Sequence, residues 1–192
     1  DAVMLSGETS VGKFPVVTVH TMAHIADTTE KYIASVPEQA HGAKLNLKTM
    51  HLSVAVARGV WQIVKDLKCK LVVIWSQTGS TARIFSKHRF PIPIIALSSD
   101  PRALRRMALH YGVYAQEMKP PGDMAALVDM VDRYVQEKKV AEAGDRIVVV
   151  AGSSLGTPST MNGVVIHTLG ESWLTAGSPG AQPQLAIGIE NT

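Results

Sequence analysis

Apolar and polar residues alternate along most of the chain in blocks that predict strands and helices in turn. Near-continuous apolar runs predict strands at 71–75, 94–97, 112–117, 146–151 and 164–169. Between and before them, apolar residues at three- and four-residue spacing predict helices over 49–68, 80–89, 100–110 and 123–139. Continuous apolar strands separated by helices indicate a sheet that is covered on both faces. The pattern therefore predicts an α/β fold of three α/β/α layers with a mainly parallel five-stranded sheet.

The first 36 residues predict a separate unit. Val3–Leu5 is a short apolar run that predicts a strand, a polar turn follows, and a helix is expected from Pro15 to about Val36. A strand of this kind needs neighbours to pair with, so we expect the chain to be a piece of a longer protein. At the other end the composition shifts to Gly, Pro, Gln and Ala, which predicts disorder or one modest strand near 185–189. We expect three parts: 1–36, 37–171 and a tail at 172–192.

Composition excludes several classes of function. Of the 192 residues, 46% are apolar, which supports a sizeable core, and the net charge is only +3 with both signs interspersed. That balance argues against a nucleic-acid-binding face, and no apolar run approaches the ~20 residues of a membrane span. The single cysteine, Cys69, excludes an internal disulfide and fits a reducing cytoplasm. We expect Cys69 to be a small buried or semi-exposed residue rather than a nucleophile.

Small polar residues gather where the first strand of the predicted sheet gives way to a helix. The turn consists of Ser76, Gln77, Thr78, Gly79, Ser80 and Thr81. Open α/β sheets bind ligands at the carboxyl ends of their strands, and the first amides of a helix favour an anion. Hydroxyl and amide donors together with a glycine therefore predict a phosphate cradle. Capping of the helix explains the same residues, and both interpretations stay open.

A second loop, 151–163, leaves the carboxyl end of the strand at 146–150 and is rich in glycine and hydroxyl residues. It fits a loop that closes over a polar ligand, although a flexible connection is the alternative. No catalytic constellation accompanies it. His20 and His24 are four residues apart without a third metal ligand, and no Gly-x-Ser-x-Gly pattern supports a hydrolase.

The opening residues DAVMLSGETSVGKFP, at 1–15, strongly resemble the end of the catalytic barrel of the pyruvate kinase family. The later motifs follow the order of that family's C-terminal domain. They are PIIALS at 93–98 and the Gly-rich segment 152–162 leading to His167. The resemblance covers about residues 1–171. It implies that 1–36 is the last β/α unit of a TIM barrel and that 37–171 is the C-terminal regulatory domain.

The resemblance also implies a reaction and its place. The family transfers phosphate from phosphoenolpyruvate to ADP in glycolysis, in the cytoplasm, with Mg²⁺ and usually K⁺. Its catalytic and metal-binding residues lie upstream of the part that this chain resembles. We therefore expect no catalytic residue and no metal within this chain, and no activity from the chain alone. Ser6 and Glu8 would border the active site. A purely structural role in closing the barrel is the alternative for both.

For the C-terminal domain the resemblance implies regulation. The turn at 76–81 would hold the phosphate of an effector, and a loop would close over it, comprising Thr157, Pro158, Ser159, Thr160, Met161 and Asn162. Ser80 stands where fructose-bisphosphate-activated members often have a basic residue, so a sugar monophosphate or AMP is an equally open candidate. Arg83 could supply charge. Helices near 49–68 and 80–110 are candidates for homotetramer contacts. The alternative is a free-standing module that binds a phosphorylated metabolite without catalysis.

Overall fold

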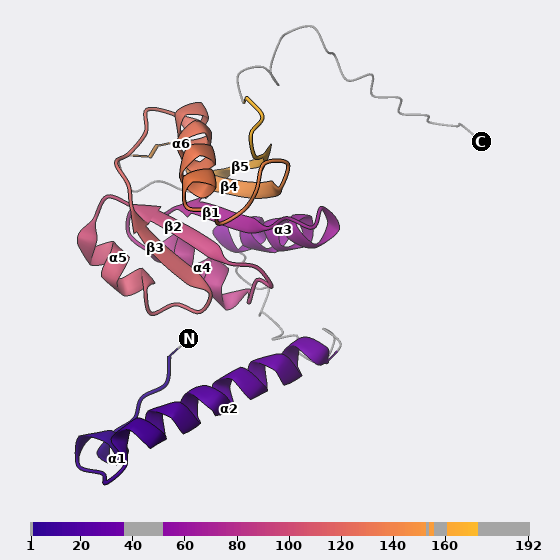
Figure 1. The fold of residues 1–192 in the computed structure, drawn as a ribbon. Coiled ribbons are helices and arrows are strands. Elements are labelled where there is room, and N and C mark those ends of the chain that lie inside the picture. The colour runs from indigo at the N-terminus through magenta and orange to yellow at the C-terminus, as the bar shows by residue number, and fades with distance from the viewer. Residues whose placement is uncertain (1, 37–51, 153, 156–160, 173–192) are drawn as a thin grey trace, which may run out of the picture. The chain divides into compact units, whose positions relative to one another are not determined.

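The computed structural model describes residues 2–36, 52–152, 154–155 and 161–172. The chain divides into two compact units, Asp1–Met50 and His51–Thr192 (Figure 1). The expected linker after residue 36, the tail from 173 and its possible strand near 185–189 lie outside the described residues. The loop residues Thr157, Pro158, Ser159 and Thr160 also lie outside them.

The first unit is helical. It consists of α1 (Gly7–Ser10) and α2 (Pro15–Ser35), and Pro15 occupies the first helical position of α2, as the sequence predicts. The predicted strand Val3–Leu5 is wrong, because these residues have no regular structure. The polar turn after it closes into α1, where the Ser10 amide donates to the Ser6 carbonyl at 3.0 Å. A strand needs a backbone partner, and the described residues of this unit contain no second strand to supply one.

The second unit is built on a five-stranded sheet with the order β3-β2-β1-β4-β5. Its strands are β1 (Leu71–Trp75), β2 (Ile94–Ser98), β3 (Val113–Glu117), β4 (Arg146–Gly152) and β5 (Met161–Thr168). The first four run parallel, and β5 pairs antiparallel with β4. This confirms the mainly parallel sheet. The last strand begins three residues before its predicted start, so Met161 and Asn162 belong to β5 rather than to a loop.

Helices cover both faces of this sheet (Figure 1). They are α3 (Leu52–Asp66), α4 (Ser80–Lys87), α5 (Pro101–Met107) and α6 (Met124–Glu137). Successive side chains of β1 point to opposite faces, so Val72 and Ile74 pack with α3, α4 and α5, whereas Leu71 and Val73 pack with α6. The three-layer α/β/α arrangement is therefore confirmed. Cys69 lies buried in the first of these cores, and burial raises the pKa of its thiol.

Two of the helices begin where the sequence predicts, because an aspartate caps each. The Asp100 carboxylate accepts from the Arg102 amide at 2.8 Å, and the Asp123 carboxylate accepts from the Ala126 amide at 2.8 Å. An N-terminal aspartate satisfies amides that have no partner inside the helix. The cap at Asp100 also fixes where α5 leaves the carboxyl end of β2.

A partly buried carboxylate ties α6 to the end of β5. Asp132 Oδ2 lies 2.6 Å from His167 Nε2 and accepts from the Gly170 amide at 2.9 Å. His167 is buried, and the Gln136 side-chain amide donates to the other oxygen of Asp132. Burial raises the pKa of Asp132, but the hydrogen bonds from His167, Gly170 and Gln136 outweigh burial and lower the pKa overall. The ionised carboxylate therefore stabilises the folded chain.

Replacing Asp132 with Asn should lower the free energy of unfolding by about 1–3 kcal/mol at pH 7, the range for hydrogen bonds to a charged group. A carboxyl whose pKa is lowered by folding contributes stability above its ordinary pKa near 3.8 and loses that contribution as the pH falls through the lower folded value. The difference between the two proteins should therefore shrink below about pH 4.

Urea titrations of the 192-residue chain at several pH values measure this difference. Asp129→Asn is the matched control, because no hydrogen bond to its carboxylate exists among the described residues of α6 and its neighbours. The control should change stability by no more than about 0.5 kcal/mol. An Asp132→Asn effect that stays constant down to pH 3 would contradict the assignment.

Candidate functional site

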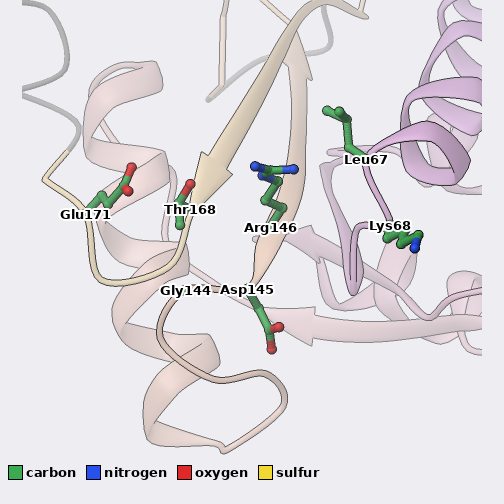
Figure 2. A pocket seen from close by; sticks show the side chains of 7 residues that line it. All are labelled: Leu67, Lys68, Gly144, Asp145, Arg146, Thr168 and Glu171. Atoms are coloured by element: carbon green, nitrogen blue, oxygen red, sulfur yellow. The ribbon is translucent and has the colours of Figure 1, made fainter.

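An open cavity of about 300 Å³ lies at the amino ends of the parallel strands, away from the predicted site (Figure 2). Its lining residues are Leu67, Lys68, Gly144, Asp145, Arg146, Thr168 and Glu171. Two cations and two carboxylates share it, so it presents no excess of either charge. None of the residues of the predicted phosphate cradle lines this cavity.

The predicted cradle, Ser76–Thr81, leaves the carboxyl end of β1 and enters α4. Its first residue points inward. Ser76 is buried, its hydroxyl accepts from the Ala82 amide at 3.4 Å, and its carbonyl accepts from the Gly79 amide at 3.2 Å. The hydroxyl of Ser76 thus contacts the first turn of α4 rather than solvent. For this residue the geometry matches the capping interpretation.

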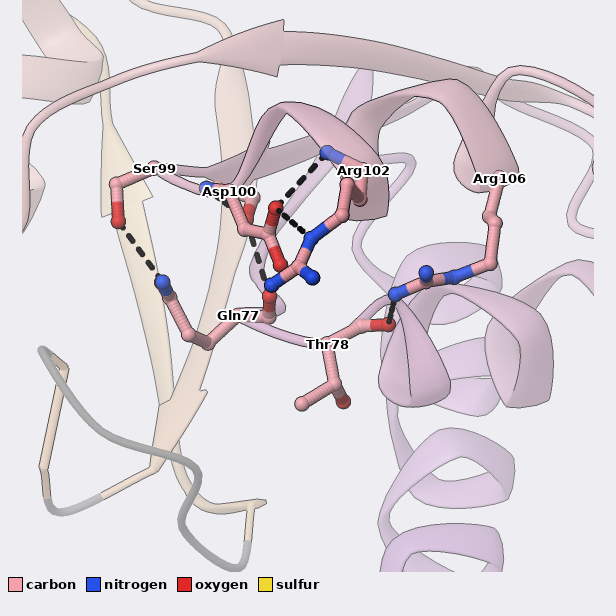
Figure 3. A network of polar contacts seen from close by, with 7 residues as sticks. Gln77, Thr78, Ser99, Asp100, Arg102 and Arg106 are labelled. Carbon is pink, nitrogen blue, oxygen red and sulfur yellow. Dashed lines mark hydrogen bonds and ion pairs between the residues drawn. The ribbon is translucent and has the colours of Figure 1, made fainter.

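Gln77 ties the turn to the neighbouring strand (Figure 3). Its side-chain amide donates to Ser99 Oγ at 2.8 Å, and its carbonyl accepts from the buried Ser98 hydroxyl at 3.2 Å. Ser98 Oγ also accepts from the Asp100 amide at 3.1 Å. Gln77 Oε1 is buried and has no hydrogen-bond partner among the residues that the structure describes. These bonds hold the carboxyl ends of β1 and β2 together.

Two hydroxyl side chains in the second half of the turn face solvent. Thr78 and Ser80 are exposed, and their hydroxyl oxygens lie 2.9 Å apart. The Ser80 amide donates weakly to Thr78 Oγ1 at 3.4 Å. Within the described ranges no hydrogen bond engages the Thr81 amide. Hydroxyls and a helix-terminal amide on one exposed surface are the groups that a phosphate oxygen accepts from.

Gly79 makes the sharp change of direction at the start of α4. Its φ is +85°, in the left-handed region that favours glycine. A Cβ added there would lie 3.1 Å from Met107 Cγ. Met107 is fully buried at the end of α5, so the turn lies directly against that helix. Glycine is needed both for its backbone conformation and for this close approach.

Arg106, next to Met107, is a residue of this region that the sequence did not reveal. Its Nη2 donates to the Thr78 carbonyl at 3.0 Å, across 28 residues of sequence (Figure 3). The sequence offered one indication that a cation would lie near the turn, which was an excess of positive charge after it. Residues 80–112 contain Arg83, Lys87, Arg89, Arg102, Arg105 and Arg106 but only one acid, Asp100. Sequence alone does not say which of these cations meets the turn.

Arg83, the cation expected to serve the turn, is exposed one turn into α4. Burial lowers the pKa of His110, and the positive charges of Lys87 and Arg83 lower it further. No hydrogen bond joins the Arg83 guanidinium to Ser76–Thr81 in the described structure.

The remaining candidates lie elsewhere. In the segment expected to close over the ligand, Met161 is buried in the core at the start of β5 and Asn162 is exposed. In the first unit, Glu8 Oε2 accepts from the Ser6 amide at 2.9 Å, and both residues are exposed. The backbone amides of Glu8 and Ser6 lower the pKa of the Glu8 carboxyl. Among the described residues, no three His, Cys, Asp or Glu side chains form a group that could hold a metal, and no helix is long and apolar enough to cross a membrane.

The second unit belongs to the class of three-layer α/β/α domains with a polar turn after the central strand. Many proteins share this architecture, and comparison with known proteins identifies the family. The family profile described as "Pyruvate kinase, alpha/beta domain" matches residues 54–167. This match covers more than half of the chain, so the chain belongs to the pyruvate kinase family.

Individual relatives agree. The chain is 31% identical over 189 residues to pyruvate kinase of Sporosarcina psychrophila, covering 98% of this chain and 31% of the relative. It is 33% identical over 175 residues to pyruvate kinase of Dictyostelium discoideum, covering 90% and 34%. The chain therefore spans about a third of the length of the curated relatives it matches.

Solved structures give the same fold. A crystal structure of Cryptosporidium parvum pyruvate kinase matches with a TM-score of 0.64 at 25% identity, covering 87% of this chain and 32% of that one. A second pyruvate kinase structure from that organism has a TM-score of 0.69 at 24% identity, with the same coverage. At this identity the second likeness supports the fold alone.

Replacing Gly79 with Ala should lower the free energy of unfolding by about 1–3 kcal/mol, because the left-handed backbone is strained with a Cβ and Met107 must shift. Gly59→Ala is the matched control. Gly59 lies exposed in α3 with no atom within 4 Å of an added Cβ, so alanine should stabilise the helix by about 0.5–1 kcal/mol. Chemical denaturation of the 192-residue variants measures both changes. Equal effects of the two substitutions would contradict the account of the turn.

Proposed function

We propose that this chain is the C-terminal part of a pyruvate kinase and that its Ser76–Thr81 turn binds the phosphate group of a regulatory small molecule. The family match carries the proposal, because residues 54–167 include both the turn and the segment Thr157–Asn162. The exposed hydroxyls of Thr78 and Ser80 and the first amides of α4 support it. In this proposal residues 157–160, which lie outside the described residues, close over the bound ligand, and Met161 and Asn162 anchor that segment as the start of β5.

The reaction of the longer protein is part of the same proposal. It transfers a phosphoryl group from phosphoenolpyruvate to ADP, giving pyruvate and ATP, in the cytoplasm. We assign residues 1–36 to the last β/α unit of the catalytic barrel, 37–171 to the regulatory domain and 172–192 to a tail. Ser6 and Glu8 would border the active site. We place the Mg²⁺ and K⁺ ions of the reaction on residues of the catalytic barrel outside this chain.

The ligand class follows from the donors of the turn. Ser76–Thr81 contains hydroxyls, one side-chain amide and backbone amides but no lysine or arginine. Such a set suits one phosphate group better than two. A sugar monophosphate or AMP is therefore proposed ahead of a sugar bisphosphate.

In this proposal, ligand binding regulates the enzyme by changing the arrangement of its subunits and takes no part in the phosphoryl transfer itself. A ligand shifts a population of subunit arrangements only by its difference in affinity between them. We propose that the longer protein is a homotetramer and that helices within 49–68 and 80–110 contribute to its contacts. Binding at Ser76–Thr81 would then favour one arrangement of the subunits.

A phosphorylated ligand should raise the melting temperature of the 192-residue chain. The panel is glucose 6-phosphate, fructose 1,6-bisphosphate, AMP and inorganic phosphate, with glucose and adenosine as unphosphorylated controls. Binding only to the folded chain stabilises it by mass action, so the shift should grow with ligand concentration. Unmoved melting curves across the whole panel would refute the regulatory proposal.

Thr78→Asp should weaken that binding by at least about tenfold, because a carboxylate near the phosphate adds like-charge repulsion in a partly desolvated site. Thr28→Asp, which makes the same change of charge at an exposed position in α2, is the matched control and should leave the dissociation constant unchanged. Isothermal titration calorimetry measures both. Equal losses in the two variants would place the binding site elsewhere.

The chain alone should convert no phosphoenolpyruvate and ADP to pyruvate and ATP, because we place the catalytic and metal-binding groups upstream. The measurement is a coupled pyruvate assay with Mg²⁺ and K⁺ at saturating substrates, with the complete pyruvate kinase of Sporosarcina psychrophila as the positive control. Turnover above the no-protein rate that scales with chain concentration would show that catalytic groups are present here.

A further inference from the structure

The turn at 76–81 carries no cation of its own, but a cation from another helix touches it. Arg106 extends from the last turn of α5 and donates from Nη2 to the Thr78 carbonyl at 3.0 Å (Figure 3). Its neighbour Met107 packs against Gly79, where an added Cβ would lie 3.1 Å from Met107 Cγ. Two consecutive residues of α5 therefore contact two consecutive residues of the turn.

The charge of Arg106 is not neutralised. Within the described parts of the chain Arg106 contacts no carboxylate, and its single hydrogen bond is to the uncharged Thr78 carbonyl. A guanidinium has five N–H donors, so most of them remain for another acceptor. The Thr78 and Ser80 hydroxyls lie on the same exposed part of the turn.

The other nearby arginines are less suited to this role. Arg102 donates from Nε to Asp100 Oδ1 at 3.4 Å, so the only acid of this segment already offsets its charge. Arg83 is exposed and has no hydrogen bond to the turn in the described structure. Arg105 is exposed and has no hydrogen bond to the turn in the described structure. Arg106 is the cation that the hydrogen bonds join to the proposed site.

We infer that Arg106 supplies from α5 the positive charge of the proposed phosphate site, so that the site is formed jointly by the β1–α4 turn and the end of α5. The inference rests on the proposed function and names the charged group that the turn itself lacks. The ligand class is a phosphate monoester in its dianionic form, held by hydroxyls and amides of the turn and by this guanidinium.

The physical argument concerns charge and preorganisation. Hydroxyls and helix-terminal amides orient a phosphate, but only a cation balances two negative charges, and arginine matches phosphate oxygens with parallel donors. Arginine has a long side chain that loses freedom when it binds. Because the Thr78 carbonyl already holds Arg106 beside the turn, part of this cost is met before a ligand arrives.

The test compares three substitutions at Arg106 in the 192-residue chain, with glucose 6-phosphate and AMP as probes in calorimetry. Arg106→Gln removes the charge and keeps only a neutral amide donor on a shorter side chain, and it should weaken binding by about tenfold or more. Arg106→Lys restores the charge and should recover most of the affinity. Arg106→Met removes both the charge and the donor. Arg105→Gln, one residue away in the same helix, is the matched control and should bind as the unmodified chain does.

The salt and pH dependence of the binding affinity distinguishes a charge contact between Arg106 and the phosphate from a purely structural role of Arg106. If Arg106 meets the phosphate, affinity should fall as added salt rises, and the fall should be shallower in Arg106→Gln. Affinity should also decrease as the pH falls below about 6, where a phosphate monoester takes up its second proton, and Arg106→Gln should flatten this decrease. A residue that only shapes the turn would change melting temperature without changing either slope.

Each outcome decides between the claims. If no probe binds the unmodified chain, the proposed function fails and this inference fails with it. If the probes bind and Arg106→Gln binds equally well, the inference is overturned and the proposed function stands. If Arg106→Gln and Arg106→Lys lose affinity equally with unchanged salt slopes, Arg106 is structural and the inference is again overturned. Loss in Arg106→Gln, recovery in Arg106→Lys and no effect in Arg105→Gln support it.

Discussion

The central strand β1 sets the geometry of the whole domain because it is enclosed on every side. All five residues of β1 are buried, and the strand is hydrogen-bonded to β2 on one edge and β4 on the other. No polar side chain can be accommodated before the strand ends. The chain therefore turns immediately after Trp75, and polar residues begin there. The parallel register that pairs Trp75 with Leu97 then brings Gln77 beside Ser98 and Ser99, which creates the hydrogen bonds that hold the turn.

The sequence pattern predicted the helices and strands of this domain well, because buried positions are apolar and their spacing differs between helices and strands. Apolar runs correspond to strands that are buried on both faces, and Asp100 and Asp123 mark helix starts through their own side-chain bonds. Pattern could not supply the order of the strands or the antiparallel direction of β5, because both depend on partners far away in sequence. It failed at Val3–Leu5 for the same reason. An apolar run is compatible with a strand but becomes one only where a neighbour offers backbone partners.

In the candidate turn, too, some features could be predicted from the sequence and others depend on residues far away in the chain. The position of the turn, its hydroxyls and its glycine were readable in the sequence, but the left-handed backbone of Gly79 and its contact with Met107 were not. Nor was the orientation of each side chain. Ser76 and Gln77 are engaged by Ala82 and by residues of β2 and its following loop, whereas Thr78 and Ser80 face solvent. Arg106 was missed because 28 residues separate it from Thr78, and only the fold brings the two together.

Helix electrostatics offer a reason to carry the cation on α5 rather than on the turn. The N-terminus of α4 has partial positive charge, so a lysine or arginine at Ser80, in its first turn, would be disfavoured in the absence of a ligand. The last turn of α5 has partial negative charge from its carbonyls, and cations there are stabilised. Arg106 occupies that last turn while its guanidinium extends to the start of α4. The unliganded domain thus keeps a positive charge beside the turn without the repulsion that a basic residue within the turn would cause. The cost of this arrangement is dependence on tertiary structure, because the proposed site would form only while α5 is packed against Gly79 through Met107.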